Sequence, residues 1–127
     1  PYNVRALSRS RVRDISCGPS YTAAVTQKRD VHMWSENSEG QLAAGDLRPR
    51  FVPTRIAAFG GEDRHKRICS VSCGNHHCAA LSLSGMVYTW GSSVTNHVNS
   101  GCLGLGSNTR TLEPRQVIAI KTKTIVI

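Results

Sequence analysis

One stretch, Val71-Ser-Cys-Gly-Asn-His-His-Cys-Ala-Ala-Leu-Ser82, occurs in two versions in this chain. The other version lies 56 residues earlier and reads Ile15-Ser-Cys-Gly-Pro-Ser-Tyr-Thr-Ala-Ala-Val-Thr26. The match continues without a gap to the two tryptophans, Trp34 and Trp90. Self-similarity over such a length is typical of proteins built from repeated structural units, so the fold follows from the unit.

The repeat continues beyond the tryptophans, where the second copy holds five extra residues within 92–100. After this insertion, Gly40-Gln-Leu-Ala-Ala-Gly45 matches Gly101-Cys-Leu-Gly-Leu-Gly106. Residues 1–7 resemble the end of a copy, and residues 125–127 resemble the beginning of one. We therefore expect an incomplete array: a tail of a preceding repeat at 1–10, repeat one at 11–59, repeat two at 60–120, and the start of a following repeat at 121–127.

Four short β-strands are predicted in each copy. They are expected at Val12–Cys17 and Ile68–Cys73, at 22–26 and 78–82, at 31–34 and 86–90, and after Pro53 and Pro114. These segments are β-branched or small and apolar, and Gly-rich turns separate them. No segment keeps an apolar period of 3.6 over three turns, which disfavours a helical repeat. An all-β fold is predicted, made of four-stranded antiparallel β-propeller blades.

The motifs of the second copy resemble the repeat of the regulator of chromosome condensation family. They are Ser72-Cys-Gly74, Ala79-Ala-Leu81, Gly85-Met-Val-Tyr88, Trp90-Gly91, Gly101-Cys-Leu-Gly-Leu-Gly106 and Pro114. The resemblance implies a seven-bladed β-propeller, of which this chain carries about two blades. The first copy departs from the pattern, with Arg29 in place of Gly85, Ser35 in place of Gly91, and Ala43-Ala44 in place of Gly104-Leu105. We expect altered turns there and a diverged member of the family.

Structural roles are predicted for residues that end strands or lie between blades. A cysteine with small neighbours suits tight packing between sheets, and each tryptophan is expected to seal a blade against its neighbour. The residues assigned such roles are Cys17, Gly18, Trp34, Cys73, Gly74, Trp90 and Gly91.

The chemistry of the cysteines and histidines favours structure over catalysis. An odd number of cysteines, five, indicates reduced thiols in an intracellular, cytoplasmic or nuclear, setting. Cys69 and Cys73 on one extended strand would lie about 13 Å apart, too far to share a zinc ion. His77 and Cys78 are adjacent on a strand and point to opposite faces, so they do not form a nucleophilic pair. We expect no catalytic residue, metal or cofactor.

The net charge of +8, from 16 Lys and Arg against 8 Asp and Glu, leaves two interpretations open. The basic clusters are Arg5, Arg9, Arg11 and Arg13, and then Arg64, Lys66 and Arg67. They form either a solvated face or a contact for an acidic partner surface. Neither cluster alternates with aromatic residues, as single-strand binders do. No apolar run approaches the roughly 18–20 residues of a membrane helix, so no membrane contact is expected.

The expected function is a non-catalytic protein-interaction scaffold, because propellers present their loops to partners. The resemblance also includes ubiquitin-ligase and signalling chains, so a larger multidomain protein of that type is expected. The alternatives are a guanine-nucleotide exchange factor for a small GTPase, and chromatin or DNA contact through the basic surface. The candidate contact residues are Tyr21, Arg48, Arg50, Asn75, His76, His77, Asn96 and His97. A mobile tip at 92–100 and a purely turn-shaping role for the histidines remain open. The two blades alone are expected to self-associate or to need the missing repeats.

Overall fold

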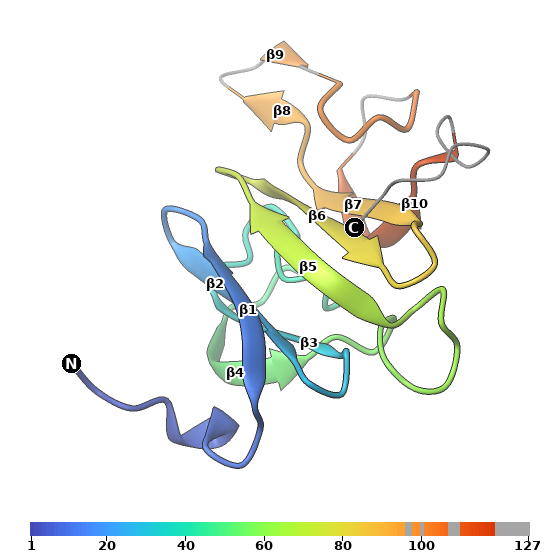
Figure 1. The fold of residues 1–127 in the computed structure, drawn as a ribbon. Helices are drawn as coiled ribbons and strands as arrows, with labels where there is room; N and C mark the ends of the chain where they lie inside the picture. Colours follow the sequence, from blue (N-terminus) through green and yellow to red (C-terminus); the bar gives the residue numbers. More distant parts are fainter. Residues whose placement is uncertain (96–97, 100, 107–109, 119–127) are drawn as a thin grey trace.

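The computed structural model describes residues 1–95, 98–99, 101–106 and 110–118, and they form two four-stranded antiparallel sheets (Figure 1). Blade 1 contains β1 (Val12–Cys17), β2 (Tyr21–Thr26), β3 (Val31–Ser35) and β4 (Arg50–Arg55). Blade 2 contains β5 (Ile68–Cys73), β6 (His77–Ser82), β7 (Val87–Gly91) and β10 (Thr111–Gln116). Within these described ranges, no helix is long and apolar enough to cross a membrane. The chain is an incomplete β-propeller, as predicted.

Each blade is a simple meander, with strand orders β1-β2-β3-β4 and β5-β6-β7-β10. The first strands, Val12–Cys17 and Ile68–Cys73, are confirmed to the residue. The fourth strands differ from the prediction, because they contain Pro53 and Pro114 rather than following them. A proline lacks an N–H and is tolerated on a strand that pairs on one side only, which is the position of β4 and β10. The sheet edge therefore accommodates a residue that would break a central strand.

The insertion in blade 2 contains a small hairpin. β8 (Val94–Thr95) pairs with β9 (Val98–Asn99) in an antiparallel ladder, outside the four-stranded sheet. The five extra residues of the second copy are therefore used in an excursion between β7 and β10 that leaves the meander intact.

The turns of the two blades have the same backbone conformation, so the expectation of altered turns is wrong. Arg29, Ser35 and Ala43 have φ values of 70°, 90° and 55°. The glycines at the matching places, Gly85, Gly91 and Gly104, have values of 85°, 96° and 66°. A left-handed conformation costs a non-glycine residue about 1–2 kcal/mol. Blade 1 keeps the geometry of the repeat at that cost.

The core lies within and between the two blades. It includes Tyr21, Ala23, Val25, Val31, Met33, Ile56, Phe59, Ile68, Val71, Ala80 and Trp90. The ring of Phe59 packs edge-on against Tyr88 at a centroid distance of 5.3 Å and lies 5.7 Å from Trp90. The residue that follows blade 1 thus packs on the aromatic side chains of blade 2, and the two sheets share one core.

The two tryptophans have different surroundings. Trp90 is fully buried, and its indole N–H donates to the carbonyl of Gln41 in the β3–β4 loop at 2.9 Å. Trp34, at the same place in blade 1, is half-buried. The indole of blade 2 is thus covered by a loop of the blade before it, and this chain provides no such loop for blade 1 in its described residues.

The N-terminal residues form a turn like the one that follows β4. Leu7 N–H donates to the Val4 carbonyl at 3.1 Å in a 3-10 helix (Arg5–Leu7), and Phe59 N–H donates to the Ile56 carbonyl at 3.3 Å. Leu7 and Phe59 are both buried. The repeated turn supports the proposal that residues 1–10 are the tail of another unit.

Candidate interaction surface

Alternate connections of the meander lie at opposite ends of the blades, which we call the loop end and the basic end. The loop end contains the β1–β2 turn (18–20), the β5–β6 turn (74–76) and the β3–β4 loop (36–49). Glu36 N–H donates to the Ser20 carbonyl at 3.1 Å, and Ser92 N–H donates to the His76 carbonyl at 2.8 Å. These hydrogen bonds join each first turn to the loop that leaves the third strand. Six of the eight candidate contact residues lie in or directly beside these connections: Tyr21, Arg48, Arg50, Asn75, His76 and His77.

Tyr21 is not a surface residue, which corrects its place among the candidate contacts. Its side chain is 2% exposed. Its hydroxyl donates to the carbonyls of Gly74 at 2.7 Å and His77 at 2.9 Å, both in blade 2. Burial is the main reason why the pKa of the Tyr21 hydroxyl lies far above its ordinary value. Tyr21 therefore holds the two blades together and remains protonated.

The β5–β6 turn presents Asn75 to solvent and keeps the two histidines half-buried. Burial lowers the pKa of His77, and the neighbouring His76 lowers it further, so the neutral imidazole is favoured. The Nδ1 atom of His76 is buried and, within the described residues, has no hydrogen-bond partner. Asn75 is thus the accessible member of this turn.

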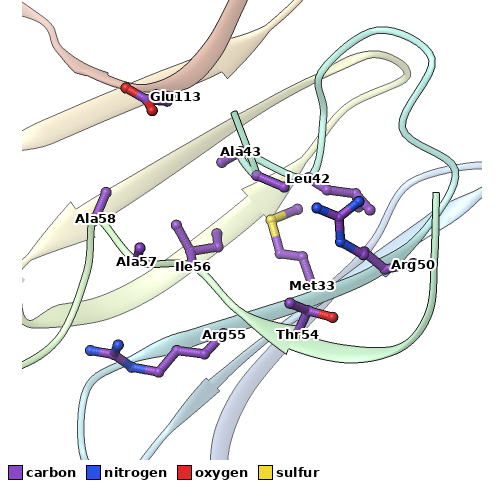
Figure 2. Close-up of a pocket in the computed structure, with 11 residues that line it drawn as sticks. Met33, Leu42, Ala43, Arg50, Thr54, Arg55, Ile56, Ala57, Ala58 and Glu113 are labelled. Carbon is purple, nitrogen blue, oxygen red and sulfur yellow. The ribbon is translucent and has the colours of Figure 1, made fainter. Parts of the chain in front are cut away.

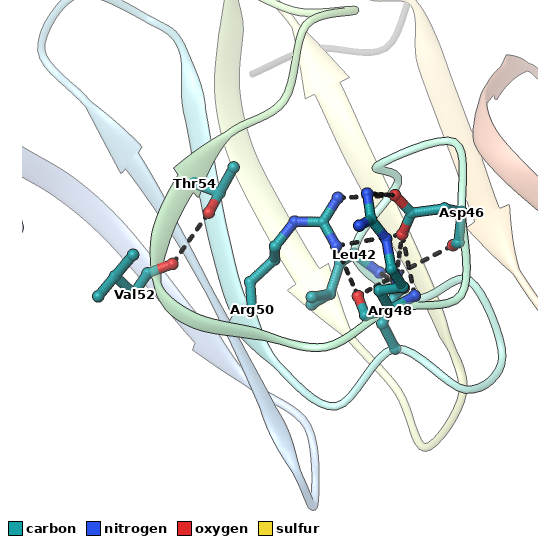
Figure 3. A network of polar contacts seen from close by, with 7 residues as sticks. Leu42, Asp46, Arg48, Arg50, Val52 and Thr54 are labelled. Carbon is teal, nitrogen blue, oxygen red and sulfur yellow. Dashed lines mark hydrogen bonds and ion pairs between the residues drawn. The ribbon is translucent and has the colours of Figure 1, made fainter.

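Arg48 and Arg50 converge on one carboxylate, that of Asp46 (Figure 3). Arg50 donates to Asp46 through two nitrogens, at 2.8 and 3.1 Å, and to the carbonyl of Arg48 at 2.7 Å. The amide of Asn37 donates to the backbone carbonyls of Asp46 at 2.9 Å and Arg48 at 2.8 Å. A bidentate guanidinium and a buried amide therefore fix the β3–β4 loop.

The two arginines have different roles within this network. Hydrogen bonds from Arg50 and from the backbone of Arg48 hold the pKa of Asp46 well below its usual range. The side chain of Arg50 is only 22% exposed, whereas that of Arg48 is 81% exposed. Arg50 orders the loop, and Arg48 extends from it into solvent.

A cavity of about 390 Å³ opens beside this loop, between β4 and Glu113 of β10 (Figure 2). Met33, Leu42 and Ile56 provide its apolar lining, and Arg50 and Arg55 line it from blade 1. Glu113 on β10 faces it from blade 2. The hollow thus combines an apolar floor with charges of both signs.

Asn96 and His97 lie outside the residues that the structure describes, so their role as candidate contacts remains a prediction. They fall between β8 and β9, in the insertion that distinguishes blade 2 from blade 1.

The basic end brings together the two charge clusters that are distant in sequence. Gln27 N–H donates to the Arg11 carbonyl at 2.7 Å, and Ile68 N–H donates to the Arg29 carbonyl at 2.9 Å. The cations of this end are Arg9, Arg11, Lys28, Arg29, Arg64, Lys66 and Arg67, and the acids of its loops are Asp30, Glu62 and Asp63. Asp30 pairs with Arg55 at 3.4 Å and lies 3.4 Å from His32. The positive charge is therefore concentrated at the end opposite to Asn75 and Arg48.

Polar contacts between β1 and β5 were not predicted from the sequence. Asp14 accepts a hydrogen bond from Val71 N–H at 3.0 Å, and Ser16 accepts one from Cys73 N–H at 2.9 Å. Their side chains satisfy backbone groups on the free edge of the next sheet. The recurrence of serine at Ser16 and Ser72 was the available signal.

The predicted close-packed glycines lie at this contact between blades. A Cβ atom at Gly18 would lie 2.8 Å from the carbonyl oxygen of Gly74, and one at Gly74 would lie 2.7 Å from the His77 ring. Cys17 is exposed, whereas Cys73, at the same place in blade 2, is half-buried.

Comparisons with known proteins agree with this architecture. Two models of the "Regulator of chromosome condensation (RCC1) repeat" match, one at residues 30–81 and the other at 12–41 and 68–96. The chain is 38% identical over 117 residues to the ultraviolet-B receptor UVR8 of Arabidopsis thaliana, covering 92% of this chain and 24% of that protein. It is 36% identical over 107 residues to the probable E3 ubiquitin-protein ligase HERC6 of Homo sapiens, covering 84% of this chain and 10% of that protein.

A solved structure of Kap60 bound to yeast RCC1 (Prp20) has the same fold. The TM-score is 0.72 at 19% identity, over 87% of this chain and 25% of the matched chain. The chain thus spans about a quarter or less of the proteins that it matches. The repeated motifs, the two meander blades and the matching models together show that this chain belongs to the regulator of chromosome condensation repeat family.

Proposed function

We propose that the two blades belong to a non-catalytic protein-interaction scaffold within a larger signalling or ubiquitin-ligase-type protein, in a cytoplasmic or nuclear setting. The observation that carries the proposal is that separate residues at the loop end order the β3–β4 loop and project from it. Asp46, Asn37 and Arg50 order the β3–β4 loop from within, and Arg48 projects from it at 81% side-chain exposure. An ordered loop with an exposed arginine is a suitable contact for a protein partner.

The similarity to HERC6 supports the ubiquitin-ligase part of the proposal. That protein is described as a probable E3 ubiquitin-protein ligase, and this chain matches 10% of its length. The partner is proposed to be a protein with an acidic contact surface, because Arg48 is the cation that this loop exposes most.

The test compares charge reversals at the two ends of the blades in the full-length chain. Arg48→Glu changes an exposed loop-end cation, and Arg64→Glu makes the same change at the exposed basic end. Proteins captured in cells by proximity labelling are quantified for both variants and for the unaltered chain. We expect the captured amount of one defined partner to fall about tenfold with Arg48→Glu, the effect of one interface hot spot. That partner should be retained with Arg64→Glu.

Two results would contradict the proposal. Equal capture by both variants would show that Arg48 does not contact the partner. Faster release of labelled GDP from a small GTPase, in the presence of the full-length chain, would replace the scaffold with an exchange factor.

The basic end supports a second candidate function, contact with a polyanion such as DNA in chromatin. In the part of the chain that the structure describes, no ion pair joins Lys28, Arg29, Arg64 or Lys66 to a carboxylate. Cations that face solvent without such partners can neutralise phosphates and release counterions.

A salt titration of DNA binding tests this second candidate. We expect the logarithm of the affinity to fall linearly with the logarithm of the salt concentration, and Lys66→Glu to reduce the slope by about one. Arg48→Glu, at the other end, should leave the slope unchanged. A flat response in the unaltered chain would eliminate phosphate contacts.

A further inference from the structure

Two thiols of blade 2, those of Cys73 and Cys78, face each other across β5 and β6. Their sulfur atoms lie 3.7 Å apart, and the two residues are direct partners in the antiparallel register. Gly74 N–H donates to the His77 carbonyl at 2.8 Å, so that neighbouring pair is hydrogen-bonded and Cys73–Cys78 is not. Such pairs have a Cα separation of about 4.5 Å, at the short end of the range that a disulfide spans.

The two thiols differ in access and acidity. Cys73 is half-buried, and Cys78 is 0% exposed. The hydrogen bond from Cys78 lowers the pKa of the Cys73 thiol below its ordinary value. Burial raises the pKa of the Cys78 thiol. A half-buried thiol with a lowered pKa beside a fully buried thiol is the arrangement found in redox-active pairs.

Among the described residues, the polar contacts that this pair makes outside blade 2 are all with blade 1. The Cys78 thiol lies 3.4 Å from the Tyr21 hydroxyl and 3.7 Å from the Gln41 carbonyl. The Cys73 thiol lies 3.6 Å from the Ser16 carbonyl. A change in the oxidation state of the pair would therefore alter the contact between the blades.

Blade 1 offers a natural control for this site. Cys17 occupies the place of Cys73, but its partner across the strands is Thr22, whose hydroxyl lies 3.9 Å from the Cys17 sulfur. The opposed thiol pair therefore occurs in one of two otherwise matched hairpins.

We propose that Cys73 and Cys78 are a redox modification site, which a hydroperoxide converts to a reversible disulfide. The Cys73 thiolate attacks one oxygen of hydrogen peroxide, and the O–O bond breaks to give a sulfenic acid and hydroxide, which becomes water with the proton that the Cys73 thiol released on ionising. The Cys78 sulfur then attacks the sulfenic sulfur, and the S–O bond breaks. The sulfenic oxygen leaves as water with the Cys78 proton. The two thiols lose two electrons, which the peroxide gains, and a dithiol reductant reverses the step.

Disulfide formation removes the single thiol proton of Cys78, which has the Tyr21 hydroxyl, the Gln41 carbonyl and the Cys73 sulfur within reach. The hydroxyl of Tyr21 keeps its bonds to the carbonyls of Gly74 and His77. The carbonyl of Gln41 keeps the indole N–H of Trp90. Oxidation thus withdraws one polar link between the blades and adds a covalent link within blade 2.

The test is a differential alkylation of the full-length chain. Native protein is treated with a small excess of hydrogen peroxide and is then denatured, so that light N-ethylmaleimide blocks every free thiol, buried ones included. Disulfides are then reduced and labelled with the heavy reagent. Cys69, Cys73, Cys78 and Cys102 lie in one tryptic peptide, 68–110, so fragment ions must locate the heavy labels. We expect heavy label on Cys73 and Cys78, and about tenfold less on Cys69 and Cys102.

Two variants separate the proposed step from general oxidation. Cys78→Ser leaves no resolving thiol, so Cys73 should stop at the sulfenic acid and react with dimedone. Thr22→Cys places a second thiol opposite Cys17 and should create the same heavy-label pair in blade 1. Heavy label on Cys69 or Cys102 as strong as on Cys73 and Cys78, an unlabelled Cys73–Cys78 pair, or the same heavy label on Cys73 in Cys78→Ser as in the unaltered chain would overturn the proposal. The unaltered chain alone decides the first two outcomes, so the test stands if a variant fails to fold.

Discussion

Blades 1 and 2 place apolar residues at the same positions but bury them to different extents. Ile68 and Val71 on β5 are 0% and 7% exposed. Their counterparts on β1, Val12 and Ile15, are 42% and 59% exposed. Blade 2 has blade 1 packed against it, and blade 1 has no such neighbour in the described chain. Burial in this fold is thus decided by the adjacent unit rather than by the residue itself.

The outer strands show the same contrast. Phe51 on β4 is 89% exposed, and Leu112, at the matching place on β10, is partly buried. A Cβ atom at Gly40 of blade 1 would lie 2.6 Å from the Leu112 side chain. Leucine thus packs on a glycine of the preceding blade, whereas Phe51 is left exposed in the described chain.

The largest expected effect is on the association of the two blades. We expect the 127-residue chain to self-associate through the exposed face of β1, or to be unstable, because that face carries Val12 and Ile15. Sedimentation at micromolar concentration measures this. Ile15→Ser should reduce association, while Ser70→Thr, at an exposed site on β5, should not. A well-folded monomer would show that the exposed face of blade 1 is stable without a neighbouring blade.

The two tryptophans provide a second test of the difference in burial between the blades. Trp90→Ala should lower the free energy of unfolding by about 3–5 kcal/mol, because it empties a fully buried site. Trp34→Ala should cost clearly less in the two-blade chain, and about as much as Trp90→Ala in a chain that includes the preceding repeat. Urea unfolding of both chains provides the values. Equal costs in the two-blade chain would mean that Trp34 is sealed within its own blade.

Exchange of the turn residues should have effects of opposite sign in the two blades. A Cβ atom at Gly91 would clash with the His76 carbonyl oxygen, and φ is 96° there. Gly91→Ser should therefore cost about 2–3 kcal/mol. Ser35→Gly should stabilise blade 1 by about 0.5–1 kcal/mol, since it relieves a positive φ of 90°. Thermal unfolding of the two variants would reveal two effects of the same sign if the turns were not equivalent.

The hydroxyl of Tyr21 provides a smaller test of the contact between the blades. Tyr21→Phe should cost about 1–2 kcal/mol, because the Gly74 carbonyl loses its donor. His77→Phe changes the matched position in blade 2. The structure shows no hydrogen bond from the His77 side chain to any residue that it describes. It should cost less in the same urea experiment. The reverse order would contradict the assignment of Tyr21 to the contact between the blades.

The smallest effect concerns Asp46 in acid. Its carboxyl has a depressed pKa in the folded chain, with Arg50 as the main cause. Its contribution to stability is therefore complete above the unfolded value of about 3.9 and is lost as the pH falls through the folded value. The urea midpoint of the unaltered chain should fall below about pH 4 more steeply than that of Asp46→Asn. Parallel pH profiles would exclude the effect.

The strands could be predicted from the sequence because their signals are local. The β-branched run Val12–Cys17 and its copy Ile68–Cys73 end at glycines, and the repeat fixes their equivalence. The all-β architecture followed from the same signals, and the structure confirms it. The repeat thus allowed strand assignments that a single short segment would not have supported.

The contacts between blades could not be predicted because they join residues that are far apart in sequence. Tyr21 and Gly74 are separated by 53 positions, and Trp90 and Gln41 by 49. A tyrosine in a polar turn is typical of a surface contact, so only the docking of the two sheets shows that it is buried. The pairing of Cys73 with Cys78 needed the register of a three-residue turn. The left-handed conformation of Ser35 was hidden because serine rarely adopts it.

The prolines of the outer strands affect how further chains can add to this molecule. Pro53 and Pro114 remove a donor from β4 and β10, so these rims are poor templates for another strand. At the opposite edge of blade 2, Asp14 and Ser16 already occupy two donors of β5. Growth by strand pairing, the route to fibrils, is thereby hindered on both sides of that sheet. Units add face against face instead, which is the direction that leads around a ring.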